Sequence, residues 1–435
     1  MFQKWMYLNK LKINSFNLSR KKLNFLENFN FVFIEKLFRI VLSIIVVSKV
    51  SKFLGPENFG TLSLIESFYS ILIALSALGI DSVIIKEFKE NNYEKNVVAG
   101  SSFIIKLCSS LLISVIAISL SFFTDNSELK FGILVISLSI IFTPFNVIDY
   151  YYQSKLDLKK VSTVRSLVFV FSSLLKLTIV YFNIPWKYLF LTILIEQFLV
   201  SFLYYKIKPF GFNFKTFNLS RKLLNYFFKS SIFLFITSFS LILYSRIDQI
   251  MIKFLLTDYD LGNYSASMKI VETLYIFPTI FLSSIFPIMI EKSKEGDKLF
   301  FVKLYRFFFF FSLIISACVF LFSDLITSFI YGTEFSSTSQ ILKLNVIAVF
   351  FYSYKLISVQ IIYVNSFYKS LLIQTISSIA INIILNYILI IKFGVFGAIY
   401  STLISLFYSV FVYEFFDCNL RKYYRFKFLA FNGNS

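Results

Sequence analysis

Charged side chains inside long apolar runs are the residues of this chain best suited to chemistry. About nine Lys or Arg and seven Asp or Glu are assigned to the interior of the helices: Lys36, Arg39, Lys49, Lys106, Lys176, Arg246, Lys269, Lys343 and Lys355; Glu35, Glu66, Asp81, Asp149, Glu196, Asp248 and Glu272. A charge at the centre of a bilayer costs about 2.5–3.5 kcal/mol. Most of these groups must therefore face one another or a wet cavity, where they can bind an anion or exchange a proton or cation.

The charges are concentrated on four of the apolar runs. Ten of the sixteen lie in the runs 31–54, 59–85, 227–252 and 261–289. Transporters built from repeats bind their substrate where the repeats meet. We therefore expect cavity cations that bind the substrate, and carboxylates that act in coupling or gating. The cations are Arg39, Lys106, Arg246, Lys269 and Lys355, and the carboxylates are Glu35, Glu66, Asp149, Glu196, Asp248 and Glu272.

Helical spacing predicts partners for some of these charges. Glu35 and Arg39 are four residues apart, and Lys269 and Glu272 are three apart, so each pair can form on its own helix. Arg246 and Asp248 are two residues apart on the chain and point to different sides of a helix, so they cannot pair directly. At least one of those two needs a partner on another helix, or a ligand.

Asn382 and Asn386 form a second polar pair, within the run 368–391. Their spacing places both amides on one face of a helix. Side-chain amides at such positions in membrane proteins form hydrogen bonds to neighbouring helices. We expect that role for both residues.

The elements that position these charges are membrane-spanning helices. The chain has 435 residues, of which 57% are apolar, and a mean hydropathy of +0.75. Runs of about 20 apolar residues predict spanning helices. About twelve occur, at 31–54, 59–85, 98–123, 130–152, 161–182, 187–206, 227–252, 261–289, 304–323, 338–364, 368–391 and 394–415. The stretch 320–332, which Asp324 interrupts, fits either an extension of the ninth helix or a short re-entrant piece.

Several classes of chemistry are excluded or unsupported. The chain has no His, so no histidine proton relay or His metal ligand can form. Its three cysteines, Cys108, Cys318 and Cys418, lie far apart and show neither metal nor disulfide spacing. No phosphate-binding loop, serine-hydrolase elbow or zinc-protease motif is present. The sequence thus predicts no cofactor, no metal and no covalent catalysis.

Loop charges predict the orientation. Lys and Arg gather at 4–22, 155–165, 206–222 and 421–427, which places both termini in the cytoplasm by the positive-inside rule. The net charge of +19 is therefore explained by topology, and nucleic-acid binding is not expected.

The string FNLSR occurs at 16–20 and again at 217–221. At this offset, 13 of the 39 positions from 16 to 54 are identical, and one insertion aligns Gly60 with Gly262. We infer a duplication of six helices, with parallel halves related by a pseudo-two-fold axis along the membrane normal. The expected organisation is a cytoplasmic basic segment, a first bundle, a linker, a second bundle and a cytoplasmic tail: 1–30, 31–206, 207–226, 227–416 and 417–435.

Three stretches resemble a known family. FLGPENFGTLSLIESFYSILIALSALGIDSVIIKE (53–87), DYYYQSKLDLKKVSTVR (149–165) and SRIDQIMIKFLLTDYDLGNYSASMKIVETLYIFPTIFLSSIFPIM (245–289) are similar to bacterial polysaccharide flippases of the Wzx type. These belong to one superfamily with multidrug-and-toxin-extrusion transporters. The resemblance implies two six-helix bundles and a central cationic cavity lined by the first, second, seventh and eighth helices.

The resemblance also implies an activity. It predicts a bacterial inner-membrane flippase that moves an undecaprenyl-diphosphate-linked oligosaccharide to the outer leaflet by alternating access. Such an oligosaccharide would be an O-antigen, capsule or exopolysaccharide repeat unit, as in lipopolysaccharide biosynthesis. The implied partners are this lipid-linked substrate, membrane lipids, coupling H⁺ or Na⁺, and a glycan polymerase or other assembly proteins.

Three alternatives stay open at this point. A drug or cation antiporter of the same superfamily would favour an acidic lining, whereas the embedded charges are nine basic to seven acidic. A membrane glycan polymerase or ligase would normally carry a larger aqueous loop than any found here. A non-transporting membrane scaffold would not explain why so many charged residues lie within the spanning helices.

Overall fold

The computed structural model describes residues 20–207, 209, 212 and 217–430, and the side chains from residue 34 onward. The described residues form helices and short connections and contain no strand. The first half holds α2 (Arg20–Ala77), α3 (Asp81–Glu90), α4 (Lys95–Ser121), α5 (Ser127–Ile140), α6 (Asn146–Ser154), α7 (Leu158–Tyr181) and α8 (Leu189–Ile207). The second holds α9 (Arg221–Leu255), α10 (Asp258–Glu295), α11 (Lys298–Tyr331), α12 (Thr338–Asn345), α13 (Ala348–Asn365), α14 (Tyr368–Phe393), α15 (Val395–Phe407), α16 (Glu414–Phe416) and α17 (Arg421–Leu429).

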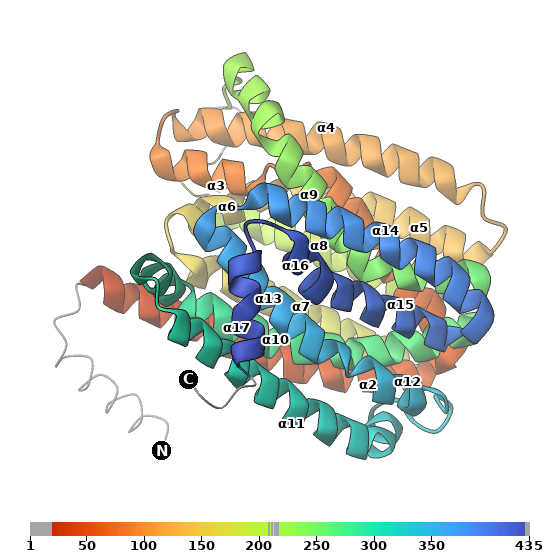
Figure 1. The fold of residues 1–435 in the computed structure, drawn as a ribbon. Coiled ribbons are helices and arrows are strands. Elements are labelled where there is room, and N and C mark those ends of the chain that lie inside the picture. Colours follow the sequence, from red (N-terminus) through yellow and green to blue (C-terminus); the bar gives the residue numbers. More distant parts are fainter. Residues whose placement is uncertain (1–19, 208, 210–211, 213–216, 431–435) are drawn as a thin grey trace, which may run out of the picture.

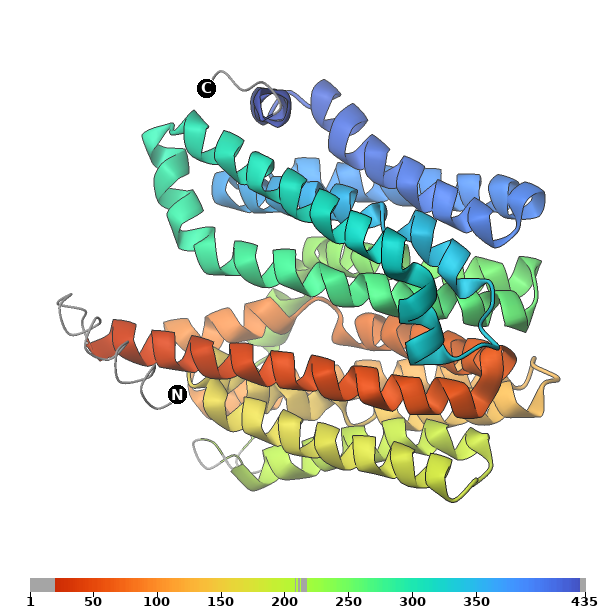
Figure 2. The same cartoon turned by 90° about the horizontal axis from the view of Figure 1, so that it is seen from below.

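The helices agree with the twelve predicted spans. Ten helical segments among the described residues are long and apolar enough to cross a membrane, and α2 together with α3 forms one further, bent candidate. The first two predicted runs both lie mainly on α2. This helix is broken at Gly55, whose φ of 67° lies in the left-handed region that glycine tolerates. Pro56 follows, and the chain turns back, so that α2 forms two antiparallel legs (Figure 2).

The ambiguous stretch 320–332 proves to be a continuation of a helix. α11 is unbroken to Tyr331, and Asp324 on it forms an ion pair of 2.9 Å with Lys343 on α12. An exposed charge near a helix end can pair in this way without breaking the helix.

The chain forms two bundles packed side by side (Figures 1 and 2). α2 to α8 make one bundle and α9 to α16 the other, and the start of α2 and the short helix α17 lie at the same end of the molecule. We call this the terminal end and the opposite one the far end. The two bundles share one buried apolar cluster, which joins residues such as Phe59 and Ile65 on α2 to Ile252 on α9 and Tyr264 on α10.

Local features support the inferred duplication. Arg20 begins α2 and Arg221 begins α9, so the last residue of each FNLSR copy opens its half. The remainder of the first copy lies outside the described residues. The fourth span of each half is also broken, at Thr143–Phe145 between α5 and α6 and at 346–347 between α12 and α13. Equivalent breaks at equivalent places are expected of repeats.

The two halves touch through their backbones near the far end, at Gly60 and Gly262. A β-carbon on Gly262 would lie 1.9 Å from the carbonyl oxygen of Pro56, and one on Gly60 would lie 2.4 Å from that of Asp258 and 2.9 Å from the amide nitrogen of Gly262. These are the two glycines that the repeat alignment pairs. Only residues without a side chain permit such an approach.

α17 was not anticipated from the sequence, and a buried ion pair fixes it to the second half. Lys427 donates to Glu414 at 2.7 Å and to the carbonyl oxygen of Val410 at 2.6 Å, and both charged side chains are almost fully buried. Val410 lies in a π-helical turn, Tyr408–Tyr413, whose altered hydrogen bonding leaves a carbonyl group for Lys427. Burial lowers the pKa of Lys427, and Glu414 opposes that effect.

We expect Lys427→Met to lower the free energy of unfolding by about 3–5 kcal/mol, because it leaves Glu414 buried without its cation. Thermal unfolding of the purified protein in detergent measures the loss. Lys427→Met combined with Glu414→Met should recover most of it, because no buried charge then remains. A double variant as unstable as the single one would contradict this explanation.

Candidate functional site

Two adjoining cavities lie between the two bundles. The first, of about 600 Å³, is lined by α2, α9, α10 and α11 and includes Ser63, Glu66, Arg246, Lys269 and Glu272. The second, of about 530 Å³, lies toward the terminal end. It is lined by α2, α9, α10, α13 and α15 and includes Lys36, Arg39, Tyr244, Tyr352, Asp248 and Thr402. Glu272 and Ile276 line both, so the cavities are neighbours.

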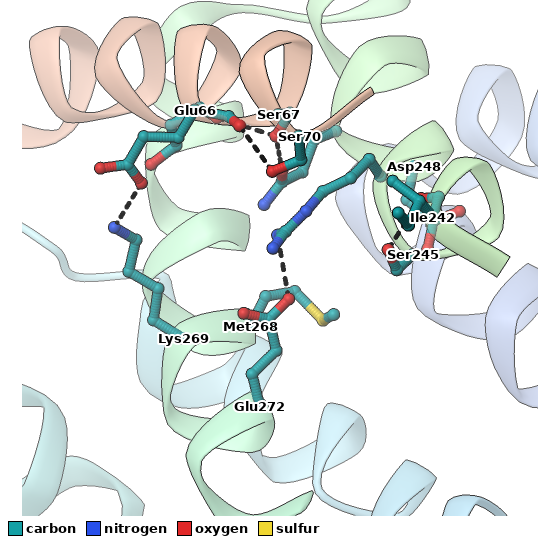
Figure 3. Close-up of polar contacts among 12 residues, drawn as sticks. Glu66, Ser67, Ser70, Ile242, Ser245, Asp248, Met268, Lys269 and Glu272 are labelled. Carbon is teal, nitrogen blue, oxygen red and sulfur yellow. Dashed lines mark hydrogen bonds and ion pairs between the residues drawn. The ribbon is translucent and has the colours of Figure 1, made fainter. Parts of the chain in front are cut away.

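The first cavity is crossed by polar contacts between the two halves (Figure 3). Lys269 on α10 donates to Glu66 on α2 at 2.8 Å, and Ser67 on α2 donates to the side-chain oxygen of Gln249 on α9. Both contacts join the first two helices of one repeat to those of the other. They lie deeper in the molecule than the glycine contact at the far end.

Arg246 finds its partner on the neighbouring helix. It donates to Glu272 at 2.9 Å (Figure 3), and both side chains are partly exposed in the cavity. The pairing of Lys269 with Glu272, which their spacing allows, is therefore not the one that forms. The two residues are three apart on α10, but Lys269 points toward α2 and Glu272 toward α9, where oppositely charged partners are available.

The predicted pair on the first leg of α2 is confirmed. Arg39 lies 3.4 Å from Glu35, which also accepts hydrogen bonds from Ser166 at 2.9 Å and Ser162 at 3.5 Å on α7. Arg39 stacks over the Phe169 ring at 4.7 Å and lines the second cavity. Glu35 thus holds Arg39 toward the space between the bundles.

Asp248 is a buried carboxylate whose partners are all uncharged. It accepts hydrogen bonds from Tyr264 on α10 at 2.8 Å, from Asn386 on α14 at 2.6 Å and from Thr402 on α15. No Lys or Arg among the described residues forms an ion pair with it. Asn386 therefore forms the predicted interhelical hydrogen bond, and it also donates to Asn382 on its own helix at 3.1 Å.

Lys355 is a buried ammonium group without a carboxylate. Its side chain is 7% exposed, and its nitrogen lies 4.5 Å above the Tyr244 ring, which lines the second cavity. Among the described residues no hydrogen bond or ion pair satisfies it. A buried cation in this condition is a strong candidate for binding an anionic group.

Three predicted site residues lie elsewhere. Lys106 on α4 pairs with Asp81 and donates to Tyr150 at 3.2 Å, and Asp149 on α6 pairs with Arg165 at 3.0 Å. Glu196 is half-buried on α8. None of Lys106, Asp149 and Glu196 lines either cavity, so the structure does not bring them to the other predicted residues. The rotation of each helix about its axis decides this, and apolar runs of this length do not reveal it.

Sequence reasoning missed several uncharged lining residues. Tyr275 and Tyr352 stack with ring centroids 3.8 Å apart in the second cavity, and Tyr244 lies beside Lys355. Paired aromatic faces can stack on sugar rings, but among 27 Tyr and 59 Phe nothing in the sequence distinguishes these three. Gln249 and Thr402 were missed for the same reason, because uncharged polar side chains are common in spanning helices.

Solved structures of transporters share this fold. An inward-facing multidrug-resistance MATE family transporter of the MOP superfamily aligns with a TM-score of 0.70 at 12% identity, over 91% of this chain and 96% of that one. The lipid II flippase MurJ in an inward closed conformation aligns with a TM-score of 0.70 at 17% identity, over 92% and 90%. A MOP superfamily transporter from Pyrococcus furiosus, described as having a binding pocket of reversed polarity, aligns with a TM-score of 0.60 at 12% identity, over 90% and 94%.

At these identities the structures show a common fold. No curated protein sequence was found to match the chain. The model of one family, described as "Polysaccharide biosynthesis protein", matches residues 25–293, which include α3 to α9 and nearly all of α2 and α10. The match covers more than half of the chain, including α9 and most of α2 and α10, which are three of the six helices that line the two cavities. This multi-pass membrane protein therefore belongs to the polysaccharide biosynthesis protein family.

Proposed function

We propose that this protein is a flippase for a lipid-linked oligosaccharide, which it moves from the cytoplasmic to the outer leaflet by alternating access. The substrate we propose is an undecaprenyl-diphosphate-linked repeat unit of O-antigen, capsule or exopolysaccharide. The membership of the polysaccharide biosynthesis family supports this proposal. The observation that carries it is the buried Lys355, which no described residue pairs with, beside a cavity that also holds Arg39.

The arrangement suits an anionic head group attached to sugars. Arg39, Arg246 and Lys269 can each exchange a carboxylate partner for a diphosphate oxygen, through charge-assisted hydrogen bonds. Lys355, which is buried, has no such partner among the described residues. The stacked pair Tyr275 and Tyr352 offers aromatic surface to a sugar. The prenyl chain would stay in the lipid between the bundles.

The conformation suits the first step of such a cycle. The halves are in backbone contact at the far end, while the second cavity lies toward the terminal end. If the termini are cytoplasmic, as the loop charges predict, this is a state that receives substrate from the cytoplasm. Breaking the Lys269–Glu66 bridge would be one requirement for the halves to rock apart.

Asp248 is our candidate for the coupling residue. Glu66 and Glu272 are already neutralised by Lys269 and Arg246, whereas Asp248 is buried among uncharged donors. A buried carboxylate without a cation must bind a proton or a cation to be stable. A drug or cation antiporter would bind its cation at such a carboxylate. The buried Lys355, which has no ion-pair partner among the described residues, instead favours an anionic substrate.

The test is complementation of a bacterial strain that lacks its own flippase. Arg246→Ala and Lys355→Ala should each reduce surface glycan by at least tenfold, while lipid-linked oligosaccharide accumulates on the cytoplasmic side. Lys343→Ala is the matched control, because Lys343 pairs with an exposed Asp324 and lines neither cavity. Normal surface glycan in well-expressed Arg246→Ala and Lys355→Ala variants would reject their proposed role.

A further inference from the structure

A third cavity, of about 880 Å³, lies at the terminal end, apart from the two between the bundles. It is formed where α17 approaches the turn between α10 and α11. Four of its lining residues are cations and one is a carboxylate: Lys298, Arg421, Lys422, Arg425 and Asp297. An excess of three positive charges around one cavity indicates an anionic ligand.

The cations of this cavity are available to a ligand. Among the described residues, none of Lys298, Arg421, Lys422 and Arg425 forms an ion pair, and all four are exposed. The carboxylate of Asp297 does not neutralise these four cations, because it interacts with other groups. Asp297 accepts a hydrogen bond from the backbone N–H of Phe300 at 3.0 Å and pairs with Lys292 at 3.2 Å. These contacts hold the pKa of Asp297 below its usual value, with Phe300 contributing most.

α17 has the placement of a helix that lies on a membrane surface. Figure 2 shows it end-on while the spanning helices run across the view, so its axis crosses theirs at the terminal end. Its buried face is anchored by Tyr423, Phe426 and Lys427. Phe416 at the end of α16 and Phe428 on α17 itself are large aromatic residues that are 75% and 48% exposed. Basic and aromatic residues together on such a helix are typical of binding at the interface of anionic bilayers.

The cavity is held in shape by the protein itself. The buried Lys427–Glu414 pair ties α17 to α16, and the hydrogen bond from Lys427 to Val410 ties it to the π-helical turn that follows α15. Arg306 on α11 donates to the carbonyl oxygen of Ala430, just after α17, at 3.0 Å. The basic face of α17 is thus fixed opposite Lys298 and does not depend on a ligand for its position.

We propose that this cavity binds the phosphate head group of an anionic phospholipid of the adjacent leaflet. The four cations supply charge-assisted hydrogen bonds to the phosphodiester, and the exposed aromatic side chains contact the acyl region. A free phosphate would use the cations alone and would gain nothing from the helix's placement at the bilayer surface. The site is distinct from the cavities of the proposed transport function and does not depend on what they carry.

The experiment titrates the detergent-solubilised full chain with phosphatidylglycerol or phosphatidylcholine and counts bound lipids by native mass spectrometry. We expect one phosphatidylglycerol to bind at least tenfold more tightly than phosphatidylcholine. Arg421→Gln/Lys422→Gln/Arg425→Gln should weaken that binding roughly 100-fold. Arg221→Gln/Lys222→Gln/Lys229→Gln is the matched control, since it removes three exposed cations from α9 and should leave the affinity unchanged.

A second measurement uses the unaltered basic face. Cys418 lines the cavity and is exposed, so a fluorophore attached to it, in a Cys108→Ser/Cys318→Ser background, should report phosphatidylglycerol binding directly. Equal responses to the two lipids, or equal affinities of the two triple variants, would overturn the proposal. It would also be overturned if inorganic phosphate bound as well as the lipid, or if a prenyl diphosphate bound more tightly, because the site would then serve another ligand.

Discussion

Gly262→Ala is expected to abolish transport and to open the far end of the molecule. The added β-carbon would lie 1.9 Å from the carbonyl oxygen of Pro56, whereas non-bonded carbon atoms rest about 3.5–4.0 Å apart. Neither atom belongs to a flexible side chain, so the two halves must separate at this point. The closed contact between the bundles would be lost, and the proposed transport cycle would lack the state that we expect to receive substrate.

Accessibility of a cysteine at position 63 measures the opening. Ser63 lines the first cavity and is 2% exposed, so Ser63→Cys in a background without the three native cysteines should react slowly with a reagent applied outside the cell. Gly262→Ala should raise that rate at least tenfold. Gly296→Ala is the control for a glycine substitution, because no atom lies within 4 Å of the added carbon. Unchanged labelling and normal transport in Gly262→Ala would show that the contact does not close the far end.

Asp248→Asn should have an effect of similar size, through a different cause. Tyr264, Asn386 and Thr402 all donate to the two carboxylate oxygens, and an amide offers only one acceptor oxygen. At least one buried donor would lose its partner, at a cost of about 1–3 kcal/mol. The amide also cannot bind a proton or a cation, so the proposed coupling would be lost and transport should fall to background.

The dependence of the melting temperature on Na⁺ and on pH separates the loss of a buried hydrogen bond from the loss of proton or cation binding. A ligand that binds only the folded protein raises its stability by RT ln(1 + [L]/Kd), so the wild-type melting temperature should depend on Na⁺ or on pH. We expect that dependence to disappear in Asp248→Asn and to survive in Asp324→Asn, which alters an exposed carboxylate outside the cavities. If Glu66→Gln or Glu272→Gln removes the dependence and Asp248→Asn does not, the coupling residue is one of those glutamates.

Most of the fold could be predicted because the bilayer imposes simple rules. An apolar run long enough to cross it must be helical, and each of the twelve predicted runs corresponds to a helical segment or a leg of α2. The repeat was visible in FNLSR and in the paired Gly60 and Gly262. The sequence did not predict the breaks within spans. It also did not predict the helix α17, because its nine residues are mostly basic or aromatic and contain no apolar run.

The candidate site could be predicted only in outline. Counting charges identified the four helix segments that meet between the halves, because a buried charge needs water or a partner. The alignment could not predict that Gly60 and Gly262 touch each other across the interface, which depends on how the bundles pack. Nor could spacing show that Lys269 reaches Glu66, 203 residues away, in place of Glu272 on its own helix.

The sequence by itself thus determined which residues must avoid lipid and which helices carry them. The tertiary structure alone decided their partners, because ion pairing depends on distances of a few ångströms set by the rotation of each helix and the packing of the bundles. Among the described residues it left Lys355 without a carboxylate and Asp248 without a cation, and it placed Lys106, Asp149 and Glu196 away from both cavities.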